Sequence, residues 1–247
     1  MNRTVRTRIG PAALIMLVGV SAFGQTRTWK EWSRKDAEKV LNDSPWAHFQ
    51  IETNTTEMFY KPTSDPRLGG GQRAPNSQAR LEEGATNQEI NVKYGIRFFS
   101  ARPVRRAFVR LMQLKESNLE PAIVERMNAF AELPSTDSII LAVTFEANDN
   151  RAQGKVMQAF ASAVSGTLKN TSYLERNDGK RLFLSEYVPP GRDGFGARFI
   201  FPRQVDGSTF INADSGEIRF FSEYAPGLKL NMRFKIADMM LEGKLEY

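Results

Sequence analysis

Residues 139–145 read Ile-Ile-Leu-Ala-Val-Thr-Phe, a run in which Thr144 is the only polar residue. An extended chain of this composition is apolar on both faces, which is typical of a central strand covered on two sides. The earlier stretch 90–99 alternates instead and places four apolar side chains on one face: Val92, Tyr94, Ile96 and Phe98. We therefore expect both stretches to be strands, with the second of them central.

Helical signals surround these two strands. We expect four helices, each marked at its start by a capping residue or a proline: Ser33, Pro103, Pro121, and Asp149 or Asn150. Ser33 is followed three residues later by Asp36, which is the spacing of a capping box. In the second helix, apolar residues recur at helical spacing and predict a stripe that faces the core: Val104, Ala107, Phe108 and Leu111.

The C-terminal part reads as short strands separated by turn residues. The expected strands are 173–175, 181–187, 197–201, 209–211, 217–224, 228–236 and 239–247. Asn177-Asp178-Gly179 predicts a hairpin turn, because glycine tolerates positive φ. The chain is therefore expected to be α+β: a largely antiparallel sheet with a C-terminal β-meander, packed against about three to four helices.

Residues 1–24 have the build of a secretory signal peptide. Three arginines precede an apolar run at 12–23 that is too short to span a bilayer, and the small residues Ala22 and Gly24 stand at positions −3 and −1 of the expected cut. We expect cleavage after residue 24 and export to the periplasm or beyond the cell as one soluble domain, 25–247, with no membrane span. The formal net charge of +6 includes those three arginines, so the exported part is less basic and no nucleic-acid partner is expected.

Residues 61–88 interrupt the pattern. They contain Gly69-Gly70-Gly71, several prolines and serines, and few large aliphatic side chains. A stretch of this composition buries too little apolar surface to order itself, and we expect a mobile loop.

The composition excludes several kinds of chemistry. The chain has no cysteine and a single histidine, His48, so disulfides, thiolate metal sites and a catalytic thiol are excluded. A serine triad is disfavoured, since the chain has no Gly-x-Ser-x-Gly elbow. We accordingly expect no cofactor, no metal and no catalytic residue.

Three groups of residues are candidates for ligand binding. Trp46 and His48 lie in an aromatic-rich segment and could stack on a ligand, or else Trp46 packs and His48 faces solvent. Arg102, Arg106 and Arg110 recur along one helix and could meet an anionic partner, or else form a solvated face.

The third group is the loop 189–196, which reads Pro-Pro-Gly-Arg-Asp-Gly-Phe-Gly. It leads from strand to strand, so it is not a phosphate-binding loop, which would lead into a helix. Arg192 and Asp193 would be the polar groups of a ligand-contacting rim; the alternative is a plain hairpin connection.

Several motifs resemble an uncharacterised family of exported bacterial proteins. They are Trp32-Ser33, Asp36-Ala37-Glu38-Lys39, Leu41-Asn42-Asp43-Ser44-Pro45-Trp46 and a closing Gly243-Lys244-Leu245-Glu246-Tyr247. The resemblance implies export from a bacterium and no assigned activity.

The main functional hypothesis is an exported, non-enzymatic module of the bacterial envelope that binds a partner protein or an anionic envelope component. One alternative is a carboxylate-based hydrolase of envelope saccharides, using two of the strand acids: Glu186, Glu217, Glu223, Asp238, Glu242 and Glu246. A second alternative is a carrier of a small ligand or lipid. None of these patterns specifies an oligomeric state.

Overall fold

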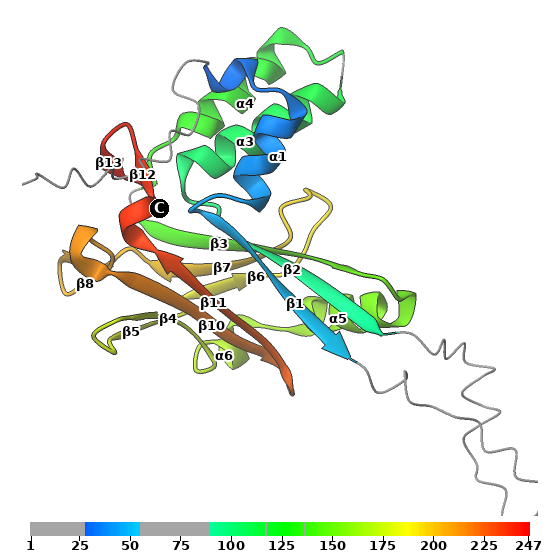
Figure 1. The fold of residues 1–247 in the computed structure, drawn as a ribbon, viewed down its shortest axis with the longest axis vertical. Coiled ribbons are helices and arrows are strands. Elements are labelled where there is room, and N and C mark those ends of the chain that lie inside the picture. The colour runs from blue at the N-terminus through cyan, green and yellow to red at the C-terminus, as the bar shows by residue number, and fades with distance from the viewer. Residues whose placement is uncertain (1–27, 55–88, 117, 136) are drawn as a thin grey trace, which may run out of the picture.

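Two antiparallel sheets face each other, and a group of helices covers one end of them (Figure 1). The computed structural model describes residues 28–54, 89–116, 118–135 and 137–247. The expected signal peptide at 1–24 and the expected loop at 61–88 lie outside these residues. The α+β class with antiparallel sheet is confirmed.

The first sheet, sheet A, has five strands in the order β1-β2-β3-β7-β6. Their bounds are β1 (Ala47–Asn54), β2 (Ile90–Phe98), β3 (Ser138–Ala147), β7 (Ala197–Pro202) and β6 (Glu186–Val188). The apolar stretch 139–145 lies in β3, the middle strand, where Ile139, Leu141 and Val143 are fully buried. The prediction of a central strand is confirmed.

The second sheet, sheet B, has the order β11-β10-β4-β5. Its strands are β11 (Leu228–Lys235), β10 (Glu217–Ala225), β4 (Ser172–Arg176) and β5 (Arg181–Phe183). Gly179 has a φ of 80° in the turn between β4 and β5, as predicted. The C-terminal strands are thus divided between the two sheets.

Three of the expected C-terminal strands differ in the structure. The stretch 181–187 contains β5 and β6, because the chain leaves sheet B at Leu184 and enters sheet A. The stretch 239–247 contains only β12 (Met240–Leu241) and β13 (Lys244–Leu245), since Glu242 and Gly243 turn the chain with positive φ. The stretch 209–211 contributes only to β9 (Ser208–Thr209), which pairs with β8 (Gln204–Val205).

Aromatic side chains fill the space between the sheets. Phe160 of α5 (Asn150–Ser162) is fully buried and stacks on Tyr224 of β10 with ring centroids 4.1 Å apart. Its other neighbours include Phe145 of β3, at 5.3 Å. Asp149 caps α5 by accepting a hydrogen bond from the Ala152 N–H, so the first of the two predicted caps is confirmed. The interior of the body is therefore packed with rings.

The remaining long helices lie together at one end of sheet A. They are α1 (Arg34–Asn42), α3 (Arg102–Lys115) and α4 (Pro121–Glu132), preceded by the short 3₁₀ helix η1 (Trp29–Glu31). Both arms of the capping box between Ser33 and Asp36 are formed. Trp29, Val109 and Ala131 make a second small core between these helices. The short helix α6 (Ser165–Leu168) and the 3₁₀ turns η2 (Ala213–Ser215) and η3 (Ile236–Asp238) complete the fold.

Side chains cover both edge strands of sheet A. At the seam between β1 and sheet B, the Gln50 amide of β1 donates to the Lys229 carbonyl at 2.7 Å and accepts from the Asn231 N–H at 2.7 Å, both in β11. At the other edge, the Ser165 hydroxyl of α6 accepts from the Tyr187 N–H of β6 at 2.9 Å. These groups satisfy edge-strand polar atoms that would otherwise be available to another chain.

Candidate functional site

A groove of about 600 Å³ opens at the end of the sheets away from the α1–α3–α4 group. The end of β1, the start of β2, the first turns of α5 and the turn between β10 and β11 surround it. Its floor is largely apolar and includes Val92, Val156 and Leu228. Its rim carries charge from four residues: Glu52, Asp149, Arg151 and Lys155. A largely apolar pocket with a few polar groups is the usual form of a small-molecule site.

Tyr94 lines the groove and is hydrogen-bonded to a second buried tyrosine, Tyr224. The two hydroxyl oxygens are 2.8 Å apart. Burial raises the pKa of both hydroxyls, so both remain protonated at neutral pH. Phe160 packs against both rings from the interior. The groove is therefore a surface depression above a solid aromatic core.

Glu52 is the acid at the inner part of the rim. Burial raises the pKa of its carboxyl group, and a hydrogen bond from the Gln50 amide at 2.9 Å partly opposes that shift. Asp149 is engaged by the helix it caps and lies 3.9 Å from the Arg151 guanidinium. The exposed Lys155 ammonium has no ion-pair partner in the described ranges. The rim thus offers both an acid of raised pKa and an available cation.

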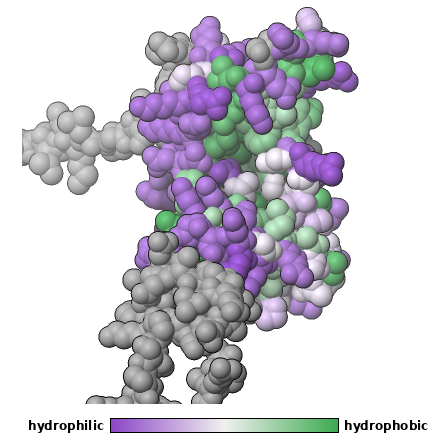
Figure 2. All heavy atoms as spheres, turned by 90° about the vertical axis from the view of Figure 1, so that its right-hand side faces the viewer, coloured by the Kyte–Doolittle hydropathy of each residue, from purple (hydrophilic) through white to green (hydrophobic). Residues whose placement is uncertain are grey.

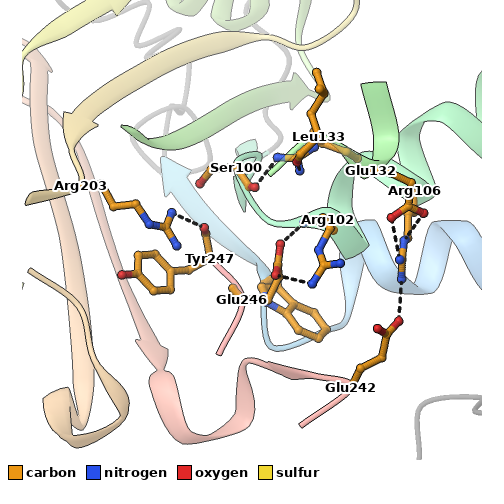
Figure 3. A network of polar contacts seen from close by, with 11 residues as sticks. Ser100, Arg102, Arg106, Glu132, Leu133, Arg203, Glu242, Glu246 and Tyr247 are labelled. Atoms are coloured by element: carbon orange, nitrogen blue, oxygen red, sulfur yellow. Dashed lines mark hydrogen bonds and ion pairs between the residues drawn. The ribbon is translucent and has the colours of Figure 1, made fainter. Parts of the chain in front are cut away.

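The predicted basic strip is occupied by contacts within the chain (Figure 3). Arg102 forms an ion pair with Glu246 at 2.9 Å, and Arg106 pairs with Glu132 at 2.8 Å and Glu242 at 3.5 Å. The Arg102 and Arg106 side chains are 24% and 13% exposed, so the solvated-face alternative is wrong for them. Their positive charge faces carboxylates of the same chain rather than the surroundings.

The other two arginines of α3 bind carbonyl groups. Arg105 is buried and donates to the Ser100 and Leu133 carbonyls, and Arg110 donates to the Trp32 carbonyl at 2.7 Å. These bonds connect α3 to three segments: the residues just before α3, the residue that follows α4, and the segment before α1. The arginines of α3 therefore hold this helix against the neighbouring segments of the chain.

Two carboxylates are held ionised by this network. Burial alone would raise the pKa of the Glu246 carboxyl, but the hydrogen bonds and charge of Arg102 outweigh it and hold the pKa below its ordinary value. In the same way, Arg106 and the Trp29 indole N–H lower the pKa of the Glu132 carboxyl against the effect of burial. Acidification consequently weakens the contacts that join the helices to the C-terminal segment.

Trp46 belongs to the same network, whereas His48 does not. The Trp46 side chain is buried, and its indole N–H donates to the Glu246 carbonyl at 2.7 Å. His48 lies on the inner face of β1, 5.0 Å from the Phe234 ring, so the expectation that it faces solvent is wrong. Burial lowers the pKa of the His48 imidazole, and the Asp43 carboxylate partly opposes this. The structure thus brings Trp46 and Arg102 to one residue, Glu246.

The loop 189–196 is anchored by its aromatic residue. Phe195 packs against Phe99 and Phe108 with centroid distances of 4.6 and 4.5 Å. Asp193 pairs with Arg198 at 2.7 Å and accepts from the Phe195 N–H. Arg192 is exposed and forms no hydrogen bond or ion pair with any described residue. Neither Arg192 nor Asp193 lines the groove.

An apolar band is visible on one side of the half that holds the helices (Figure 2). The exposed apolar residues of this half include Met112 and Leu114 of α3 and Leu133, which follows α4. This surface lies at the opposite end of the molecule from the groove.

Five of the six strand acids pair with bases rather than with one another. Described pairs are Glu217–Arg233, Glu223–Lys229, Asp238–Lys235, Glu242–Arg106 and Glu246–Arg102. Within the described ranges, no group of three or more acidic or histidine side chains is placed to hold a metal ion. Each helix in these ranges is too short or too polar to span a lipid bilayer.

Val92, Tyr94 and Asp149 were predicted only as structural residues, and no sequence pattern predicted the groove that they line. Alternation along β1 places Gln50 and Glu52 on the same inward face as His48, opposite Tyr94 and Val92 of β2. The signal that could have predicted the groove is the presence of polar side chains at inward positions of a strand, because buried polar groups need hydrogen-bond partners or a water-filled groove.

Comparison with known proteins adds no relative. No protein-family model, no curated protein and no solved structure matches this chain.

Proposed function

We propose that this chain is an exported, non-enzymatic binding module of the bacterial envelope, and that its ligand is an amphiphilic envelope component held in the groove. Export rests on the signal-peptide pattern of residues 1–24. The observation that carries the binding role is the groove of about 600 Å³, with an apolar floor and a charged rim.

The lining suggests how such a ligand would lie. Its apolar part would cover Val92, Val156 and Leu228, which removes apolar surface from water. An anionic head would meet Lys155, whose ammonium has no ion-pair partner among the described residues. The packed rings of Phe160, Tyr94 and Tyr224 favour a ligand on the surface over one enclosed between the sheets, as the carrier alternative would require.

The test uses the fluorescent amphiphile 1-anilinonaphthalene-8-sulfonate, which combines an aromatic body with one anionic group. We expect saturable fluorescence enhancement by the folded protein. Leu228→Ser and Lys155→Ala should each weaken binding by about tenfold, since each removes one half of the proposed recognition. The matched controls Val205→Ser and Lys169→Ala change exposed residues outside the groove and should bind as the wild type does.

Circular dichroism and melting temperature confirm that each variant is folded before it is titrated. Equal affinity in the groove variants and their controls would place the probe elsewhere and would refute the proposal. The same result follows if the folded wild-type protein gives no saturable enhancement.

Glu52 supports a second candidate, the carboxylate-based hydrolase. A carboxyl group whose pKa is raised by burial is the form a general acid takes, and Asp149 supplies a second carboxylate in the same groove. This candidate expects release of reducing ends from envelope saccharides, abolished by Glu52→Gln and unaffected by replacement of an exposed acid of β6, Glu186→Gln. Absence of turnover by the wild type would eliminate it and leave the binding role.

A further inference from the structure

A second depression lies on the opposite face of β2, where sheet A is turned away from sheet B. It has a volume of about 400 Å³ and is lined mainly by polar residues. Those that matter here are Phe49, Lys93, Arg97, Thr144 and Glu146. Successive residues of a strand point to opposite faces, so this depression is separated from the groove by the sheet itself.

Arg97 is the central group of the depression. Its Nε donates to the Leu41 carbonyl at 2.6 Å, Nη1 to the Thr144 hydroxyl at 2.7 Å and Nη2 to the Asn42 side-chain oxygen at 3.2 Å. Gly95 leaves room for the guanidinium, because a Cβ there would lie 2.7 Å from Nη2. Two of the five N–H donors of an arginine are left without an acceptor in the described part of the chain.

The three acceptors of Arg97 are uncharged. No carboxylate of the described residues forms an ion pair with this guanidinium, and burial lowers its pKa to about 10, so it is still charged at neutral pH. Leu41 and Asn42 belong to the last turn of α1, and the partial negative charge of that helix end favours a cation. The helix end therefore positions the guanidinium without neutralising it.

Lys93 brings a second positive charge to the same place. Its ammonium lies 3.7 Å from the centroid of the Phe49 ring, and the Arg97 guanidinium carbon lies 6.0 Å from that centroid. Glu146 is the one acidic residue of the lining, so the lining carries one net positive charge. The Thr144 hydroxyl accepts from Arg97, which leaves its own hydrogen to be donated.

We propose that this depression, the Arg97 pocket, binds an oxyanion, a carboxylate or a phosphate group, between Arg97, Lys93 and the Thr144 hydroxyl. The planar guanidinium, the ammonium and the hydroxyl supply donors that match the oxygens of such a group. The bound charge would neutralise a guanidinium that has no carboxylate partner among the described residues. The pocket is independent of the groove and of the function proposed for it.

The test follows the backbone amides of Gly95 and Thr144 and the Arg97 Nε–H by nuclear magnetic resonance. Inorganic phosphate and acetate are added separately at an ionic strength held constant with sodium chloride. We expect saturable shifts at these three groups. Lys93→Ala should weaken binding by about tenfold, and Thr144→Val should weaken it less, because it removes a neutral donor. The exposed control Lys169→Ala should leave it unchanged.

Lys93 is exposed, so its variant is expected to fold, and its melting temperature is measured first. Saturation by phosphate alone assigns a phosphate ligand, and saturation by acetate alone assigns a carboxylate. Shifts that stay linear with both anions, or equal affinity in Lys93→Ala and Lys169→Ala, would overturn the proposal. Probe binding in the groove should be the same in all three variants, which separates this test from that of the proposed function.

Discussion

Replacing Glu246 by glutamine keeps the size of the side chain and removes the charge that faces Arg102. The carboxylate accepts the Arg102 main-chain N–H at 3.0 Å and its Nη2 at 2.9 Å. Hydrogen bonds to a charged group contribute about 1.5–3 kcal/mol each, and glutamine retains only one acceptor oxygen. The Glu246 side chain is 14% exposed, so water compensates only in part. We expect Glu246→Gln to lower the free energy of unfolding by about 2–3 kcal/mol.

The sign of the pH dependence follows from the lowered pKa. The folded state holds Glu246 ionised below its ordinary pKa of 4.5, so its contribution is complete at neutral pH and is lost as pH falls through the lowered value. Urea unfolding at pH 7 and pH 3 measures this. The difference in unfolding free energy between wild type and variant should be largest at pH 7, equivalent to a melting-temperature difference of about 4–12 °C, and smaller at pH 3.

Arg102→Met and the double variant complete a thermodynamic cycle. A coupling energy of at least about 1 kcal/mol between Arg102 and Glu246 is expected, since the two side chains touch. A Glu246→Gln variant as stable as the wild type at pH 7, or a gap that does not change with pH, would refute this reasoning.

Three further predictions concern the interior, the seam and the groove. Phe160→Ala should cost about 3–5 kcal/mol in urea unfolding, because it empties a buried site between stacked rings, and a loss below about 2 kcal/mol would contradict that packing. Gln50→Ala should accelerate hydrogen exchange at the Asn231 amide; unchanged exchange would show that the seam does not depend on this side chain. Glu52→Gln should gain stability relative to wild type between pH 4 and pH 7, because an acid of raised pKa destabilises the fold as it ionises; a constant difference in urea unfolding would argue against its burial.

The elements with local signals could be predicted from the sequence. Ser33 and Asp36 are three residues apart, so the capping box needed no knowledge of the rest of the chain. The apolar stretch 139–145 predicted the middle strand, because its apolar residues occupy both faces of an extended chain and both faces then need to be covered. The division into two sheets was not predictable, since it depends on the bend at Leu184, where no proline or glycine interrupts the alternating stretch 181–187.

For the candidate site residues, too, local patterns predicted the position of a side chain but not its partners from distant parts of the chain. Helical periodicity correctly placed Arg102 and Arg106 on the side of α3 away from its apolar stripe. It could not identify Glu246 and Glu132, which lie 144 and 26 residues further along the chain. The pocket around Arg97 was not predictable, because the end of α1 and β3 create it and neither is adjacent to Arg97 in the sequence.

The contact between Trp46 and Glu246 also bears on when this domain finishes folding. The two residues are separated by 200 positions, and the indole N–H at the start of β1 has its partner only once the segment after η3 is in place. A nascent chain on the ribosome therefore lacks this contact through most of its synthesis, as loop closure over so many residues requires the late segment to have emerged. The packing of the C-terminal segment against Trp46 therefore follows the translation of residues 240–247.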